Sequence, residues 1–152
     1  MVRYGVIAVL FFLTLFLSGK ERTGTRQPAQ GGGYDLTVKI DNIRKVAGIM
    51  EVGLYDKAEH FPKEGKQFLW IKKKVTGPVF TYTFSDLPPG DYALAVYQDI
   101  DSDGKIDKNL IGVPTEPYGF SNDIKPRLSA PSFEKTRFRL ASDTTVCITL
   151  FH

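Results

Sequence analysis

The sequence predicts an all-β fold, a seven-stranded antiparallel Greek-key β-sandwich that follows an N-terminal signal segment. Residues 34–41 alternate apolar and polar side chains without a break, as in a strand with one buried face. More short alternating stretches follow, separated by Gly, Pro, Asn and Asp, which favour turns. No stretch shows the 3.6-residue apolar period of a long helix.

The composition of the strands predicts their places in the sheets. Residues 91–98 (DYALAVYQ) are apolar at almost every position, which predicts a central strand covered on both faces. Residues 68–75 contain three lysines, which suit an exposed edge strand. Strands are expected at residues 34–41, 49–56, 68–75, 79–85, 91–98, 133–140 and 144–151.

The first 33 residues are interpreted as an export signal and a linker. A positive start precedes a 13-residue apolar run at 5–17, which is shorter than the roughly 20 residues that span a bilayer. A retained membrane anchor is the alternative. We expect a signal peptide at 1–19, a flexible linker at 20–33 and the β-sandwich domain at 34–152. The protein is then periplasmic or extracellular, and only an uncleaved signal segment would touch the membrane.

Charge and cysteine content exclude several classes of protein. The chain of 152 residues has a formal charge of +3, and all of this excess lies before residue 34. The domain is therefore neutral and lacks the basic surface of a nucleic-acid-binding protein. One cysteine excludes a disulfide framework. The length suits one domain, which we expect to be a monomer.

An acidic ladder follows the predicted central strand. Carboxylates recur at alternate positions and a glycine allows a sharp turn, as in the first nine positions of an EF-hand loop. Leu110 stands where such a loop has its bidentate glutamate, and a solvated acidic turn is the alternative. The predicted calcium ligands are Asp99, Asp101, Asp103, the Lys105 carbonyl, Asp107 and, from farther along the chain, Glu116.

The acidic ladder opens a 33-residue segment, 99–131, that is long for an idle connection. Its later part mixes glycines and prolines with aromatic residues. These aromatic residues can form a platform for a sugar or peptide, or can fold back as plugs on the sandwich. The candidate ligand loop contains Tyr118, Phe120 and Asn122.

No catalytic group stands out in the sequence, and we expect the protein not to be an enzyme. His60 lies in a polar turn and is expected to be solvated, and His152 is the last residue. Cys147 is expected to be buried in a second apolar face rather than to act as a nucleophile. Trp70 is expected to belong to the core or its rim.

Several stretches together resemble the bacterial domain of unknown function 2141 family. They are LYDKAEHFP, LPPGDYALAVYQD, the DIDSDGKID loop, LIGVPTEPYGFSND and PSFEKTRFRL. The resemblance implies a secreted or periplasmic bacterial β-sandwich without an established activity. Members often carry Asn where Asp101 and Asp103 stand here. The Leu-Pro-x-Gly-x-Tyr segment also resembles prealbumin-like and carboxypeptidase-regulatory-like modules, within a broadly immunoglobulin-like architecture.

The sequence thus predicts an exported module of binding or structural type that carries Ca²⁺ in its acidic loop. Its expected partner is an envelope glycan, peptide or protein. A prealbumin-like hydrolase is the alternative from the enzyme class, although the Tyr-Arg-Gly-Ser ending that such enzymes carry is replaced here by Thr-Leu-Phe-His. A structural envelope spacer without metal is the third interpretation.

Overall fold

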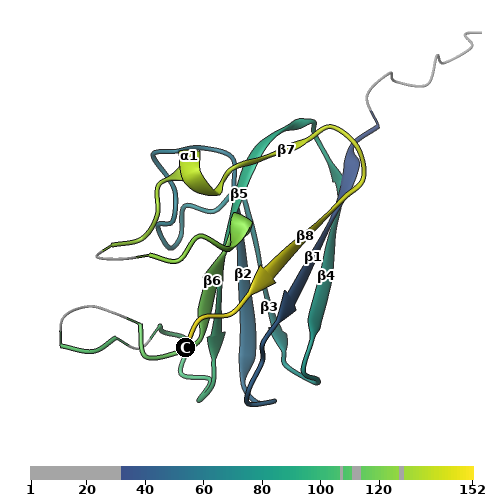
Figure 1. Cartoon of the computed structure of the whole chain (residues 1–152). Coiled ribbons are helices and arrows are strands. Elements are labelled where there is room, and N and C mark those ends of the chain that lie inside the picture. The colour runs from purple at the N-terminus through teal and green to yellow at the C-terminus, as the bar shows by residue number, and fades with distance from the viewer. Residues whose placement is uncertain (1–31, 107, 111–113, 127–128) are drawn as a thin grey trace, which may run out of the picture. The chain divides into compact units, whose positions relative to one another are not determined.

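Two β-sheets pack face to face in the computed structural model, which describes residues 32–106, 108–110, 114–126 and 129–152 (Figure 1). The three-stranded sheet has the order β4-β1-β8, and the five-stranded sheet has the order β3-β2-β5-β6 with β7 also paired to β5. The strands are β1 (Tyr34–Asp41), β2 (Ile49–Tyr55), β3 (Leu69–Lys74), β4 (Phe80–Leu87), β5 (Gly90–Asp99), β6 (Tyr118–Phe120), β7 (Phe138–Leu140) and β8 (Thr144–Thr149). The predicted β-sandwich is confirmed.

The signal peptide and most of the linker predicted from the sequence lie outside the described residues. Among the residues that the structure does describe, no helix is long and apolar enough to cross a membrane.

The main core lies between the two sheets and follows from the alternation seen in the sequence. Leu36, Val38 and Ile40 of β1 are completely buried. Met50, Val52 and Leu54 of β2 face them from the other sheet and belong to the same apolar cluster. The intervening residues of β1 and β2 therefore face outward, because side chains alternate between the two faces of a strand.

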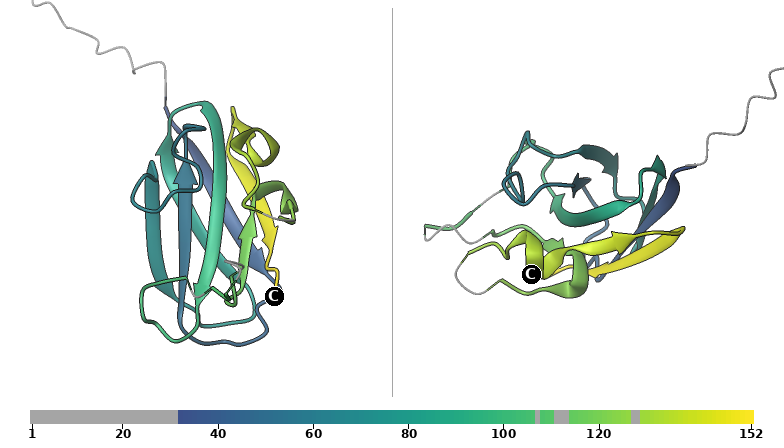
Figure 2. Two further views of the ribbon diagram at one scale, coloured as in Figure 1. Left: turned by 90° about the vertical axis from the view of Figure 1, so that its left-hand side faces the viewer. Right: turned by 90° about the horizontal axis from the view of Figure 1, so that it is seen from above.

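A second, smaller apolar cluster, which we call the outer apolar cluster, covers part of the outer face of the five-stranded sheet. It contains Tyr55, Phe61, Ala93, Phe120 and Phe133. Phe61, from the segment after β2, lies at its centre. Its ring centroid is 5.1 Å from that of Tyr55, 6.0 Å from that of Phe120 and 6.1 Å from that of Phe133. Long connections thus gather on this side of the sheet (Figures 1 and 2), and they contribute side chains that bury it.

The strand β5 is central, as its composition predicted. One edge pairs with β2, and the other pairs first with β7 and then with β6. Ser121 bridges the break between these two partners: its Oγ accepts the Leu94 N–H at 3.0 Å and donates to the Thr136 carbonyl at 2.6 Å. The lysine-rich strand β3 lies at the edge of the sheet, again as predicted.

Three details of the predicted strands were wrong. The described residues form eight strands rather than seven, because β6 forms within the segment that was predicted to be a loop. The predicted strand 133–140 begins instead with the short helix α1 (Phe133–Thr136), and only Phe138–Leu140 pairs with β5. The ladder between β1 and β8 is parallel, because the chain crosses from the second sheet back to the first before β8.

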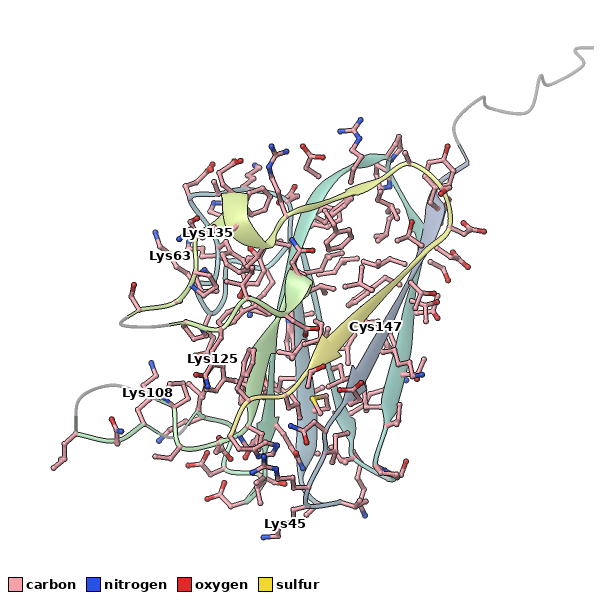
Figure 3. The ribbon with its side chains drawn as sticks, in the orientation of Figure 1. Lys45, Lys63, Lys108, Lys125, Lys135 and Cys147 are labelled. Carbon is pink, nitrogen blue, oxygen red and sulfur yellow. The ribbon has the colours of Figure 1, made fainter. Side chains whose placement is uncertain are left out.

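Cys147 corrects a further expectation. It is exposed, although its strand β8 has buried neighbours on the other face. Figure 3 shows Cys147 on the three-stranded sheet, the outer face of which is not covered by the long connections. Alternation in β8 therefore places this thiol in solvent rather than in a second apolar layer.

Candidate functional site

The acidic loop begins where β5 ends, and the turn brings its first three aspartates together. One carboxylate oxygen from each of Asp99, Asp101 and Asp103 lies within 4.8 Å of the others. Two oxygens that share one Ca²⁺ at about 2.3–2.6 Å lie at most about 5 Å apart, so this spacing is compatible with a common ion. Asp99 is 2% exposed, whereas Asp101 and Asp103 lie in solvent.

Backbone amides of the loop hold these carboxylates on the inside of the turn. Asp99 accepts the Asp103 and Gly104 N–H groups at 3.2 and 2.9 Å, and Asp103 accepts the Lys105 N–H at 2.8 Å. Gly104 has φ of +81°, a conformation that costs other residues strain. An ionised carboxylate offers about four lone-pair sites, so these bonds leave acceptors for a cation. The same bonds would also shape a solvated turn.

The start of the acidic loop is fixed by the connection between β1 and β2. The buried Gln98 Nε2 donates to the carbonyls of Lys45 and Ala47 at 2.7 and 2.8 Å. Gly48 approaches so closely that an added Cβ would lie 1.9 Å from the Asp99 carbonyl oxygen. Asp99 therefore stands on rigid backbone, and this rigidity favours a defined ligand position.

Among the described residues, the other predicted calcium ligands do not belong to the group formed by the Asp99, Asp101 and Asp103 carboxylates. Glu116 is 7% exposed, and its Oε1 accepts the Ile100 N–H at 2.7 Å, so it ties the end of the segment to the beginning of the acidic loop. Lys105 is exposed, and Asp107 lies outside the described residues. Within the described part of the chain, the group of mutually close carboxylates contains Asp99, Asp101 and Asp103 without Glu116.

A cavity of about 340 Å³ lies on the outer face of the five-stranded sheet, and we call it the outer-face cavity. Its sheet side consists of residues from four neighbouring strands. Its other side comes from the connections that follow β2 and β5 and from the segment before α1. These residues are Pro62, Glu64, Gln67, Ile106, Lys108, Pro114, Pro126, Ser129 and Ala130. The sheet residues are Glu51, Val52, Gly53, Tyr55, Trp70, Ile71, Ala95, Val96, Tyr97, Tyr118 and Phe120.

The polar groups at the floor of the cavity are paired with one another. The Glu51 carboxylate forms an ion pair with Lys72. It also accepts a hydrogen bond from the Tyr97 hydroxyl, and burial together with the Glu51 contact raises the pKa of Tyr97 far above its ordinary value. Burial, followed by the charge of Glu64, raises the pKa of Tyr55 to about 12. Both tyrosines are therefore neutral at physiological pH.

The structure divides the predicted ligand loop between two environments. Tyr118 and Phe120 line the outer-face cavity, and Phe120 is also 8% exposed and packs in the outer apolar cluster. Asn122 is not among the cavity residues. Its Nδ2 donates to the carbonyls of Lys135 and Arg137, both at 3.1 Å. The aromatic residues thus combine features of a plug and of a cavity wall, and Asn122 holds α1.

Sequence reasoning missed most of the cavity. Trp70 was expected in the core or its rim, yet it is 57% exposed and lines the cavity. Glu51 and Tyr97 were not selected at all. The one signal in the sequence was that both faces of β5 are apolar. This required that other residues cover the outer face of β5, but it did not show which residues these are.

The residues considered for catalysis lie in separate places. His60 lines a shallow hollow beside Lys66 and Phe68. The ring Nε2 of His152 is 2.8 Å from the carbonyl oxygen of Asn42, the residue that directly follows β1. Cys147 is exposed on β8.

Comparison with known proteins places the chain in a family. The model of a family described as an uncharacterized protein conserved in bacteria (DUF2141) matches residues 38–148. The chain belongs to this family. The match begins within β1 and ends within β8, so it covers both sheets of the sandwich and confirms the resemblance inferred from the sequence. Neither a curated protein nor a solved structure matches the chain.

Proposed function

We propose that the protein is an exported binding module of the bacterial cell envelope, in which a calcium ion in the acidic loop orders one wall of the outer-face cavity. The observation that carries this proposal is the continuity of the two features along the chain. Asp99, Asp101 and Asp103 form the close carboxylate group, and Ile106, only three residues later, already lines the cavity. A cation held by the loop would therefore restrain the residues that close the cavity.

Electrostatics supports a cation at this loop. Three carboxylates with oxygens within 4.8 Å repel one another unless their charge is compensated. Calcium is a hard cation that accepts six to eight oxygen ligands in flexible geometry, whereas Mg²⁺ requires a tighter octahedron. Because Leu110 replaces the bidentate glutamate of an EF-hand loop, we expect weak affinity, in the roughly millimolar range of extracellular modules.

The proposal assigns a ligand-binding role rather than catalysis. The cavity offers aromatic walls and paired polar groups, which suit recognition. Export rests on the apolar run and linker of the sequence, and we expect the mature protein to begin between Gly19 and Tyr34. Mass spectrometry of the exported protein checks this expectation, and an intact Met1 would contradict it.

The test of the metal compares thermal unfolding in chelator and in calcium. At a hundredfold excess of Ca²⁺ over its dissociation constant, binding to the folded state should stabilise it by about 2.7 kcal/mol. For a domain of this size the midpoint should rise by several degrees. Magnesium should raise it much less. Turnover of an amide or ureide substrate would instead favour the hydrolase interpretation.

A double substitution locates the effect. Asp101→Ala with Asp103→Ala should abolish the calcium-dependent rise, because it removes two of the three clustered carboxylates. The matched control, Asp56→Ala with Glu59→Ala, changes the charge equally at exposed positions outside the loop and should keep the rise. An equal midpoint in chelator and in millimolar calcium would leave the solvated-turn interpretation and a module without metal.

A further inference from the structure

The sheet side of the outer-face cavity has a regular arrangement that suggests the chemistry of its ligand. Trp70 is paired with Gly53, Gly53 with Ala95, and Ala95 with Phe120, in one row across four strands. Two small residues therefore lie between two aromatic ones. The outer strands of the row are three strand spacings apart, about 14 Å. The row has an aromatic residue at each end, and the Gln67 and Tyr55 side chains lie over Gly53, where an added Cβ would be 3.0 and 3.1 Å from them.

Exposure shows that one of these aromatic residues is accessible. Trp70 is 57% exposed, although tryptophan is usually well buried in a single domain. Phe120, in contrast, is fixed in the outer apolar cluster. An indole at a cavity edge presents a large apolar surface together with one polar group, a combination that is common in binding sites.

The described residues that line the cavity include three charged ones, Glu51, Glu64 and Lys108. In the adjacent row, Glu51 is compensated by Lys72 and accepts a hydrogen bond from Tyr97. The other charged residues of the lining, Glu64 and Lys108, have opposite signs. Other lysines labelled in Figure 3, such as Lys125 and Lys135, are not among the lining residues. Among the described lining residues the charges thus nearly cancel, which favours a ligand without net charge.

We propose that the outer-face cavity binds a pyranose unit of a neutral saccharide, which would deepen the binding role proposed above. A pyranose ring has apolar C–H faces that can stack on aromatic rings and hydroxyl groups that both donate and accept hydrogen bonds. Glu51 and Glu64 supply acceptors, and Gln67 supplies both kinds of group. The volume of about 340 Å³ is near the lower end of ligand pockets, so the cavity suits a short part of a chain.

The experiment is calorimetric titration of the mature protein with cellotriose, maltotriose and N-acetylchitotriose. At least one of these neutral trisaccharides should bind, and raising the salt concentration should leave the affinity nearly unchanged because no net charge is involved. Trp70→Ala should weaken binding by about tenfold or more. The matched control is Phe68→Ala, which removes an exposed aromatic residue of the same segment that does not line the cavity, and it should bind as the unchanged protein does.

A second variant keeps the test decisive if Trp70→Ala does not fold. Gln67→Ala changes a half-exposed residue of the lining and should also weaken binding. The proposal is overturned if none of the trisaccharides binds, if both variants bind normally, or if affinity falls steeply with salt. The calcium-dependent rise in unfolding temperature is measured on the same samples. Its persistence without saccharide binding would reject only the saccharide, and its absence with saccharide binding would reject only the metal.

Discussion

Tyr55 shows how one outward-facing residue of β2 depends on the cover above it. It is 3% exposed, its ring packs on Phe61, and its hydroxyl donates to the Lys63 carbonyl at 3.3 Å. Burial is the main cause that raises its pKa to about 12, and the charge of Glu64 adds to it. The folded protein therefore keeps this proton at pH values where the unfolded chain, with an ordinary pKa of about 10, has lost it.

The raised pKa of Tyr55 predicts that the folded protein loses stability in alkali. Because the folded state binds the proton more tightly, its contribution is complete below about pH 10 and disappears as the pH rises through about 12. The free energy of unfolding in urea, measured from about pH 9 to about pH 12, should fall more steeply for the unchanged protein than for Tyr55→Phe. The difference should reach up to about 2 kcal/mol. Parallel curves would show that Tyr55 ionises as freely in the folded state as in the unfolded chain.

The sequence predicted the grouping of the acidic residues better than that of the residues that line the cavity. Asp99, Asp101 and Asp103 are neighbours in the chain, so their approach within 4.8 Å follows from local turn geometry. Glu51, Trp70 and Tyr97 meet only because three strands pair in one register. No local pattern encodes that register, and the cavity therefore could not be read from the sequence.

Phe61 is the most buried aromatic contact between the sheet and the segment that joins β2 to β3. Phe61 is 7% exposed and contacts rings from β2, β6 and α1. It is thus the point at which this connection, the end of the long segment and the sheet are joined. Its removal should leave a void in the outer apolar cluster, because the surrounding backbone comes from separate elements.

Phe61→Ala should lower the free energy of unfolding by about 3–5 kcal/mol. Phe68→Ala, from the same connection but 41% exposed, should lower it by much less. Urea unfolding followed by circular dichroism measures both variants. A loss below about 1 kcal/mol for Phe61→Ala would mean that the connection is not anchored by this contact.

The elements that the sequence did not reveal are short and depend on tertiary contacts. β6 has three residues and pairs with β5 beside Ser121, which also fixes the carbonyl of Thr136 in α1. A helix of four residues has no internal stability of its own. Residues 34–41 and 91–98, in contrast, were predicted correctly because eight or more residues repeat one pattern of burial.

In the whole molecule, the two sheets differ in how their outer faces are covered. The three-stranded sheet contributes one face to the main core and leaves its other face, with Cys147, in solvent. The five-stranded sheet is covered on one side by the main core and over part of the other side by the outer apolar cluster. Function is therefore expected on the outer side of the five-stranded sheet, where the long connections lie (Figures 1 and 2). There the acidic loop and the outer-face cavity share one segment of chain.

This shared segment makes a prediction that does not depend on the identity of the ligand. The chain has one tryptophan, Trp70, and it lines the cavity together with Ile106, which lies within the acidic loop, and Lys108, which follows it. If calcium orders the loop, these residues should pack more closely beside the indole and exclude water from it. Addition of Ca²⁺ to the apo protein should therefore shift the tryptophan emission to shorter wavelength. Asp101→Ala with Asp103→Ala should show no shift, whereas Asp56→Ala with Glu59→Ala should retain it. An emission spectrum that stays constant while calcium raises the unfolding temperature would mean that the metal stabilises the fold without reaching the cavity.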